Sequence, residues 1–346
     1  MNDQTNQPNQ PDQPNQPDQA DHPDQVASGR TSANEGSGGE HGFRHELYPY
    51  AGEDEFLRGA LSFIGDAQAE RELVLVAVAE PRERRLRAEL EGTEAAATVS
   101  FLDAGAVGRN PARLIPAWQD WIAKRATEGH AVRGISEPSW DDRSVAEVGE
   151  LHYHEWLLNL AFALSPPWWL LCAYDRTALE PLVLETAARC HPLLLDAGEH
   201  GVNSGYTEQP YTAAELSSPC DPYQDFSFRS GELAAVRAKV AACASQHGLE
   251  GNRLRELLIA ATEVASNCVK YGGGQGTLRT WQEGSSVVCE FHDSGHIEDP
   301  LIGRVRPTLD QVGGRGMWLV QQLCDLVQIR STAETGTTIR LHVLVQ

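Results

Sequence analysis

ATEVASNCVKYGGG, residues 261–274, decides the fold of the carboxyl-terminal part of the chain. Apolar residues recur at helical spacing around it, so 251–270 is predicted to be a helix with one face in the core. Glu263 and Asn267 are four residues apart, which places them one turn apart on the opposite face. A carboxylate above a carboxamide suits a site that binds Mg²⁺ and moves a proton. The same pair is also compatible with an ordinary solvated helix face.

Three glycine-containing stretches follow this helix. The first, DSG at 293–295, ends an apolar strand. Its carboxylate can accept a hydrogen bond from a ligand amine, and its glycine lets a flat ring approach the backbone. The second, GGRG at 313–316, runs into an apolar helix whose free N–H groups attract phosphate. The third, GTT at 336–338, opens the last strand. Taken singly, each is explained as well by ordinary structure: a turn, a connection and β-forming threonines.

The order of predicted elements from Phe226 onward is α-α-β-β-α-β-β. Their predicted ranges are 231–246, 251–270, 277–282, 286–292, 314–324, 326–331 and 337–345. Apolar and polar side chains alternate from Ile339 to Val343, so one face of the sheet is predicted to be buried and the other wetter. The pattern predicts an α/β sandwich over 226–346, with helices on one face of the sheet.

The four patterns occur here in the order E-x-x-x-N on a helix, D-x-G at a strand end, G-x-G before a helix and G-T-T on a strand. In this order the chain from 226 to 346 resembles the Bergerat-fold ATPases, the GHKL group that includes histidine kinases. It looks closest to RsbW-type anti-sigma factors through ATEVASNCVKYGGG, FHDSG, GGRGMWLVQQLCDLVQIRS and GTTIRLHV. Those factors are serine kinases that use ATP and Mg²⁺, bind a sigma factor and phosphorylate a STAS-type anti-anti-sigma protein.

The resemblance implies roles for the residues that match its motifs. Glu263 would be the general base that deprotonates the hydroxyl of the antagonist protein. Asn267 would ligate Mg²⁺ against the phosphates. Asp293 would accept a hydrogen bond from the adenine amino group, and Gly295 would pack beside the adenine ring.

The glycine-rich stretch and the last strand complete the implied ATP site. Gly314 and Gly316 would hold the phosphates, and Arg315 between them is a further candidate phosphate contact. Thr338 would lie near the adenine base through a water molecule. The segment Ile297–Val312 would form a mobile lid over the nucleotide.

A histidine kinase would need a phospho-accepting histidine on a dimeric helical hairpin just upstream. Only His191, His200 and His247 are near, and 197–225, a predicted linker rich in Gly, Ser, Pro and Asn, lacks heptads. The sequence therefore favours a Ser/Thr kinase of anti-sigma factor type that regulates transcription. Two alternatives stay open: a non-catalytic module that binds ATP and sequesters a partner, and a diverged sensor histidine kinase. A homodimer is compatible with each.

The first part of the chain alternates between short apolar runs and helical patterns. The predicted strands are Leu73–Ala79, Thr98–Asp103, Ala131–Ile135 and Trp168–Tyr174, and the predicted helices are 53–69, 81–91, 111–128, 141–164 and 177–190. Near-continuous apolar strands between helices predict a parallel sheet that is covered on both faces. We expect an α/β domain over 43–196, after a disordered tail of Asn, Gln, Pro and Asp at 1–42.

Several stretches of this domain resemble the MEDS domain, a presumed sensor of small ligands that is similar to RecA-like folds. They are GRNPARLIPAW (108–118), ISEPSW (135–140), HEWLLNLAFAL (154–164), LLCAYD (170–175) and CHP (190–192). The turn after the first predicted strand is Glu80-Pro81-Arg82, without glycines to cradle a phosphate. The resemblance therefore implies a sensory domain that controls the ATP-binding domain.

Ligands of parallel sheets bind beyond the carboxyl ends of the strands. Polar residues at or after such ends, with those of helix 141–164, are the candidates for a pocket that binds an unknown small-molecule signal. They are Arg109, Asn110, Glu137, His154, Glu155, Asn159 and Asp175. The same residues are equally suited to capping helices and satisfying buried groups. Only His152 lies at ligand spacing from His154, so His154 is not expected to bind a metal.

Charge and composition exclude several classes of function. The net charge is −21, and residues 1–225 carry 37 acidic against 16 basic side chains, which repels nucleic acid and anionic lipid. The seven cysteines include no C-x-x-C pair, so reduced thiols are predicted rather than disulfides or a zinc site. No apolar run reaches the roughly 18 residues of a membrane helix, and no signal pattern begins the chain. A cytoplasmic protein is therefore expected.

Overall fold

The computed structural model describes Met1 and residues 42–140, 142–219, 223–308 and 313–345. The predicted tail, 1–42, thus lies almost wholly outside the described residues. The chain divides into two units, Met1–Gly39 and Glu40–Gln346, and every helix and strand below belongs to the second. Among the described helices, none combines the length and the apolar character needed to cross a membrane.

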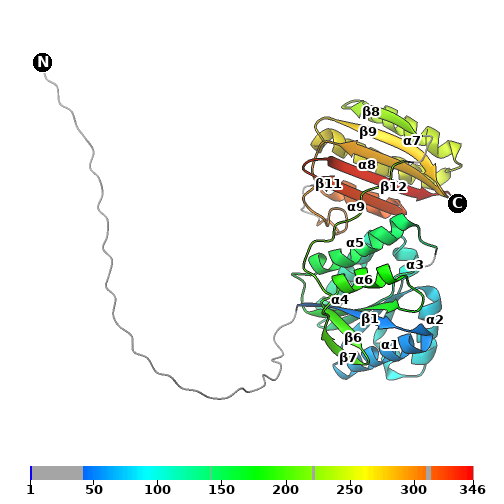
Figure 1. Cartoon of the computed structure of the whole chain (residues 1–346), viewed down its shortest axis with the longest axis vertical. Helices are drawn as coiled ribbons and strands as arrows, with labels where there is room; N and C mark the ends of the chain where they lie inside the picture. The colour runs from blue at the N-terminus through cyan, green and yellow to red at the C-terminus, as the bar shows by residue number, and fades with distance from the viewer. Residues whose placement is uncertain (2–41, 141, 220–222, 309–312, 346) are drawn as a thin grey trace. The chain divides into compact units, whose positions relative to one another are not determined.

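A seven-stranded sheet forms the first folded region (Figure 1). Its strands are β1 (Phe43–Tyr50), β2 (Leu73–Val78), β3 (Val99–Asp103), β4 (Val132–Ser136), β5 (Trp168–Asp175), β6 (Leu193–Asp196) and β7 (Glu199–Val202). They follow the order β3-β2-β4-β5-β1-β6-β7, and only β7 pairs antiparallel to its neighbour. The predicted parallel α/β domain is confirmed.

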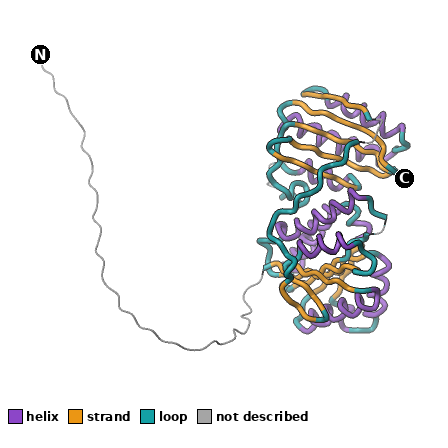
Figure 2. Tube along the Cα trace, viewed as in Figure 1, coloured by secondary structure: helices purple, strands orange, loops and turns teal. Residues whose placement is uncertain are grey.

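Helices cover both faces of this sheet (Figure 2). They are α1 (Gly52–Ala69), α2 (Glu80–Leu90), α3 (Ala104–Val107), α4 (Leu114–Thr127), α5 (Val145–Ala161) and α6 (Pro181–Cys190), with 3₁₀ turns η1 (Glu94–Ala97) and η2 (Pro111–Arg113). Val74, Val76 and Val78 of β2 enter the core with α1 and α2, whereas Leu75 and Ala77 enter the core with α4 and α5. Because successive side chains of a strand point to opposite faces, a strand buried on both sides must be apolar throughout.

The sequence prediction lacks β1, β6 and β7. The stretch FRHELYPY of β1 reads as polar, yet it lies between β5 and β6. Its buried Glu46 is satisfied by specific partners, because the carboxylate accepts a hydrogen bond of 2.9 Å from Trp169 Nε1 and lies 2.9 Å from His200 Nδ1. Strand β7 falls inside the stretch predicted to be a linker, where it pairs with β6.

The second folded region has a five-stranded antiparallel sheet in the order β11-β12-β10-β9-β8. The strands are β8 (Gln224–Arg229), β9 (Gln275–Glu283), β10 (Ser286–Asp293), β11 (Leu326–Thr332) and β12 (Gly336–Leu344), and the helices are α7 (Leu233–Gln246), α8 (Gly251–Tyr271) and α9 (Arg315–Leu323). The helices share one core with a single face of the sheet. The predicted α/β sandwich is confirmed, with β8 as one additional strand.

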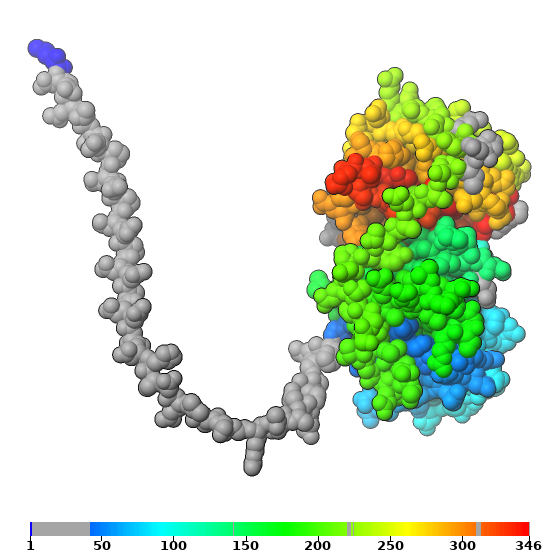
Figure 3. All heavy atoms as spheres, viewed as in Figure 1, coloured from blue at the N-terminus to red at the C-terminus, as the bar shows by residue number. Residues whose placement is uncertain are grey.

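Side chains on the other face of this sheet are less exposed to solvent than their alternating pattern predicts. Arg340 of β12 is only 3% exposed, and it donates hydrogen bonds to Glu290 of β10 and to the carbonyl of Ser217. Arg330 of β11 likewise donates to the carbonyl of Ala214. In Figure 3 the yellow-green segment before β8 runs across the red strands. The predicted linker therefore covers part of this face and satisfies its arginines.

His342 of β12 is buried on this face, with Nε2 3.1 Å from Gln328 Oε1. Burial, and then the charge of Arg340, lower the pKa of His342 to about 4. In the unfolded chain histidine takes up a proton below about pH 6.5, so the unfolded state binds more protons between these two values. We therefore expect folding stability to fall as the pH drops from about 6.5 to about 4, by about 3 kcal/mol from this residue.

The measurement is urea unfolding of the wild type and the His342→Gln variant at several pH values. Glutamine keeps a polar group near Gln328 but takes up no proton, so the variant should lose less stability on acidification. Replacement of the exposed His130 by glutamine is the matched control and should leave the wild-type slope unchanged. Parallel pH profiles for the wild type and His342→Gln would contradict the prediction.

Candidate functional site

A cavity of about 920 Å³ opens in the second folded region. Helix α8, the end of β10, the glycine-rich start of α9 and strand β12 supply its walls. Seven of the eight residues that the sequence assigns to the ATP site line it: Glu263, Asn267, Asp293, Gly295, Gly314, Arg315 and Gly316. The sandwich fold thus brings Glu263 and Gly316, which are 53 positions apart in the chain, to one cavity.

Helix α8 holds the catalytic candidates at the cavity because its two faces differ. Leu257, Ala261 and Val264 are buried in the core of the sandwich. Glu263 and Asn267, one turn apart, are half-buried and line the cavity. The amphipathic pattern of this helix therefore decides both which face packs and which face can react.

The backbone at the start of α9 lies against Glu263. A Cβ at Gly316 would stand 2.7 Å from Glu263 Oε2 and 3.9 Å from Asn267 Nδ2. Gly314, the residue before the helix, has φ of 80°, which is left-handed backbone that favours glycine. Its lack of a capping side chain leaves the first N–H groups of α9 to other acceptors. The positive end of a helix and a carboxylate thus face the same space.

Asp293 and Gly295 form a tight turn at the end of β10. The Asp293 carboxylate accepts a hydrogen bond of 2.8 Å from Gly295 N. A Cβ at Gly295 would stand 2.7 Å from the Tyr271 carbonyl oxygen, so only glycine lets this turn lie against the end of α8. The turn is held from the other side by Thr337, whose hydroxyl donates a hydrogen bond of 2.8 Å to the Gly295 carbonyl.

Thr338 does not line the cavity, whereas Thr337 does. Thr338 lies on the opposite face of β12, where its hydroxyl is 3.1 Å from His292 Nδ1. Because side chains alternate along a strand, a shift of one residue moves the hydroxyl to the other side of the sheet. Thr337 therefore lies at the cavity, in the place that the family resemblance assigns to Thr338.

Two other lining residues, Lys270 and Tyr271, escaped the sequence reasoning. Lys270 follows Glu263 by seven residues and Asn267 by three, so helical spacing alone puts it on the same face of α8. This signal was available in the sequence. A lysine here brings a positive charge to a cavity that is lined by four carboxylate residues: Glu263, Asp293, Glu298 and Asp299.

The predicted lid, Ile297–Val312, lies outside the described residues at 309–312. Its start is anchored, because Ile297 N donates a hydrogen bond of 2.8 Å to Ser331 Oγ of β11. Ile297 and Ile302 also pack against the core of the sandwich. Further along, Arg304 is buried and donates a hydrogen bond of 2.9 Å to Glu150 of α5.

Glu150 is a buried carboxylate that the sequence reasoning missed. It is 1% exposed and lies 2.9 Å from both Arg304 Nη2 and Arg330 Nη1. Arg304 belongs to the predicted lid and Arg330 to β11. A buried charge in contact with two guanidinium groups is well compensated, whereas removing it would leave buried positive charge. Glu150 therefore connects α5 to the segment that borders this cavity.

The candidates for a sensory pocket do not form one pocket. Glu137 and Asp175 do meet, at the carboxyl ends of β4 and β5, where Arg82 Nε is 3.2 Å from Glu137 Oε2 and Arg82 Nη2 is 3.9 Å from Asp175 Oδ2. Tyr50 also donates a hydrogen bond to Glu137. Burial raises the pKa of Glu137, and burial and then Glu137 raise that of Tyr50.

Arg109 and Asn110 lie elsewhere. Arg109 is exposed, and its carbonyl accepts a hydrogen bond of 3.3 Å from Arg143. Asn110 is buried, and its amide donates hydrogen bonds of 3.0 Å to the carbonyl and the side chain of Gln321 in α9. Asn110 also caps η2 by accepting from Ala112 N. The motif that contains these residues thus serves local structure and a contact with α9.

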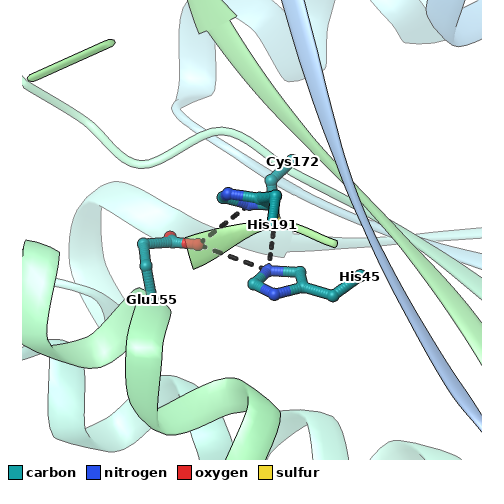
Figure 4. A group of neighbouring side chains, drawn as sticks. All are labelled: His45, Glu155, Cys172 and His191. Carbon is teal, nitrogen blue, oxygen red and sulfur yellow. Dashed lines mark hydrogen bonds and ion pairs between the residues drawn. The ribbon is translucent and has the colours of Figure 1, made fainter. Parts of the chain in front are cut away.

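The three candidates of α5 are separated by the geometry of the helix. A capping box of Ser144 and Glu147 starts this helix. His154 is buried, and burial lowers its pKa to about 4. Glu155 instead lies beside His45, Cys172 and His191 (Figure 4). Asn159, one turn further along the helix, lies 3.1 Å from His45 Nδ1 through its Oδ1.

Two family models match parts of the chain. Residues 44–192 match the family model of MEDS, the MEthanogen/methylotroph, DcmR Sensory domain. Residues 226–343 match the family model of the Histidine kinase-like ATPase domain. Both resemblances inferred from the sequence are confirmed.

Among solved structures, the chain is similar to the crystal structure of the RsbU and RsbW domains of Rv1364c from Mycobacterium tuberculosis. The identity is 17% and the TM-score 0.27, with 36% of this chain and 32% of that chain covered. This chain therefore spans about a third of that protein's length, and a likeness of this size carries no argument about the fold. No curated protein matches the chain.

Proposed function

We propose that this chain, which joins a MEDS-type domain to a histidine kinase-like ATPase domain, is a regulatory protein kinase. It transfers phosphate from ATP to a serine or threonine of a STAS-type antagonist protein, and it binds a sigma factor in the manner of an anti-sigma factor. The observation that supports the kinase activity best is the approach of Gly316 to Glu263, which puts a phosphate-binding helix end next to a carboxylate.

The residues around the cavity fit ATP and Mg²⁺. The N–H groups of α9 can approach a phosphate closely because Gly316 has no side chain. Asn267 offers an amide oxygen, which suits Mg²⁺, and Asp293 offers carboxylate oxygens to an amino group. When bound, ATP supplies a terminal phosphoryl group whose negative charge Mg²⁺ partly neutralises.

Glu263 is placed to act as a general base. It is half-buried on α8, a rigid element anchored in the core, and it faces the cavity beside the start of α9. In this position the carboxylate accepts the proton of an incoming serine or threonine hydroxyl, which makes the oxygen a better nucleophile. The N–H groups of α9 meanwhile hold the phosphate oxygens in place for the attack.

The histidines near the ATP-binding domain support transfer to a partner rather than to this chain. His191 is fully buried, and His200 lies 2.9 Å from the Glu46 carboxylate. His247 stands at the end of α7. None of these three, among the described residues, lies on an exposed pair of long helices of the kind that a histidine kinase phosphorylates.

Control by the MEDS-type domain has a physical route in α5. This helix carries Glu150, which contacts Arg304 of the predicted lid and Arg330 of β11. A small-molecule signal that shifts α5 would change these buried ion pairs and hence the segment that borders the cavity. A shift of this kind requires that the ligand bind the two states with different affinity.

The test is incubation of the full-length protein with labelled ATP and the STAS-type protein encoded nearest to it. We expect acid-stable phosphate on a serine or threonine of the partner. Acid-labile phosphate on this chain itself would identify a histidine kinase instead. Nucleotide binding and capture of the partner without any labelled protein would identify a non-catalytic sequestering module.

A further inference from the structure

Four side chains of the MEDS-type domain converge on one buried point that the ATP site does not use (Figure 4). His45 comes from β1, Glu155 from α5, Cys172 from β5, and His191 from the turn after α6. Each is at most 2% exposed. One nitrogen, sulfur or carboxylate oxygen of each residue lies within 4.8 Å of those of the other three.

In each imidazole, Nδ1 faces away from the cluster and is within hydrogen-bond distance of a neighbouring group. Nε2 faces the cluster and is therefore free to act as a ligand. His191 Nδ1 is 2.7 Å from the carbonyl oxygen of Ala187, which can only accept, so Nδ1 carries the proton. His45 Nδ1 is 3.1 Å from Asn159 Oδ1, and Asn159 Nδ2 donates 2.7 Å to the Cys190 carbonyl, which keeps Oδ1 turned toward the ring. When the two rings are neutral, Nε2 of His45 and Nε2 of His191 each present a lone pair to the cluster.

Glu155 Oε2 makes no hydrogen bond to the two imidazoles that face it, whereas Cys172 Sγ lies within hydrogen-bond distance of His45 Nε2, at 3.4 Å. Glu155 Oε2 lies 3.5 Å from His45 Nε2 and 3.4 Å from His191 Nε2. Charge-assisted hydrogen bonds between nitrogen and a carboxylate are shorter, about 2.7–2.9 Å. Glu155 Oε2 and His191 Nε2 are fully buried and have no hydrogen-bond partner among the described residues.

The spacing instead matches the ligands of a metal. In a tetrahedral site with bonds of about 2.0–2.3 Å, the ligand atoms lie about 3.3–3.7 Å from one another. The two distances from Glu155 fall in this range, as does the 3.4 Å between Cys172 Sγ and His45 Nε2.

We propose that His45, Glu155, Cys172 and His191 form a four-coordinate site for a divalent transition metal ion, with Zn²⁺ as the ion best suited to it. Two imidazole nitrogens, one thiolate and one carboxylate oxygen are the donors that Zn²⁺ takes in proteins. Binding displaces the proton of the Cys172 thiol to solvent. The ion also compensates the buried charge of Glu155.

The placement of the ligands gives this site a structural consequence. The four residues come from two strands, one helix and one turn, and they lie between positions 45 and 191 of the chain. An ion at this point ties α5 and the turn after α6 to the centre of the sheet, where β1 and β5 pair. Metal binding free energy therefore adds to folding free energy, as it does in structural zinc sites generally.

The experiment uses the full-length protein, stripped of metal with a chelator and then titrated with Co²⁺. We expect one Co²⁺ per chain, visible bands of a tetrahedral ion and a thiolate-to-Co²⁺ charge-transfer band, all removed by one equivalent of Zn²⁺. The Cys172→Ser variant should lose the charge-transfer band. Asn159→Leu, which removes only the support of His45, should weaken Co²⁺ binding by about 10–100-fold.

The matched control is Cys190→Ser, which removes a buried thiol of the same domain that is not in the cluster. This variant should keep the wild-type spectrum and affinity. Far-UV circular dichroism of every protein establishes that it is folded. The proposal would be overturned if the folded wild-type protein showed no thiolate-to-Co²⁺ charge-transfer band. It would also be overturned if the Cys190→Ser variant lost this band while the Cys172→Ser variant kept it.

Discussion

Replacing Glu263 by glutamine is expected to slow phosphate transfer to the partner protein by about 10²–10⁴-fold while ATP still binds. Glutamine has nearly the same size and keeps an oxygen at the same place, but it cannot take the proton of the attacking hydroxyl. The proposed contacts of the nucleotide with the start of α9, with Asn267 and with Asp293 do not require the charge of Glu263. The effect should therefore appear in kcat rather than in the affinity for ATP, measured by single-turnover transfer and by calorimetry.

Glu256→Gln is the matched control for this substitution. Glu256 lies on the same helix two turns earlier, where it pairs with Arg253 at 2.6 Å and does not line the cavity. Its loss should leave the transfer rate within about twofold of the wild type, because a surface ion pair contributes little. If Glu263→Gln transfers phosphate as fast as Glu256→Gln, Glu263 is not the base.

Replacing Gly316 by alanine is expected to weaken ATP binding by about tenfold or more, which corresponds to about 1.4 kcal/mol or more. The new methyl group would stand 2.7 Å from Glu263 Oε2, in the space between the carboxylate and the start of α9. The carboxylate can swing away, so the protein should still fold, and alanine itself favours a helix. Both the approach of the phosphates and the position of the base are nevertheless disturbed, so transfer should fall together with affinity.

The control for the methyl group itself is Gly149→Ala in α5, where an added Cβ meets nothing within 4 Å. Calorimetric titration with ATP gives the affinity of both variants, and thermal unfolding shows whether each is folded. The prediction fails if Gly316→Ala, correctly folded, binds ATP as tightly as Gly149→Ala.

The fold of both regions was largely predictable, because it follows from local patterns. Helices α1, α2, α7 and α8 and strands β9, β10, β11 and β12 lie within a few residues of the predicted ranges, since their apolar periodicity is strong. Strand β1 was missed because Arg44, His45 and Glu46 interrupt its apolar pattern, and their burial depends on partners that are distant in sequence. The burial of Arg340 on the outer face of β12 was not predicted for the same reason. It depends on the segment near Ser217, which folds over Arg340.

The ATP cavity was predictable from motifs whose order along the chain is preserved, and seven of its eight proposed residues do line it. The error at Thr338 shows the limit of this reasoning. A motif places residues in order, but only the strand register decides which of two neighbouring threonines faces the cavity.

The sequence by itself determined the helix with Glu263 and Asn267, the glycines before α9 and the alternation of helices and strands, because these depend on spacing within a few residues. The buried cluster of His45, Glu155, Cys172 and His191 was decided by the tertiary structure alone. The scattered cysteines had indicated reduced thiols rather than a zinc site, since they include no C-x-x-C pair. The parallel sheet pairs β1 with β5 and packs α5 and the end of α6 over them, and this packing brings the four side chains together.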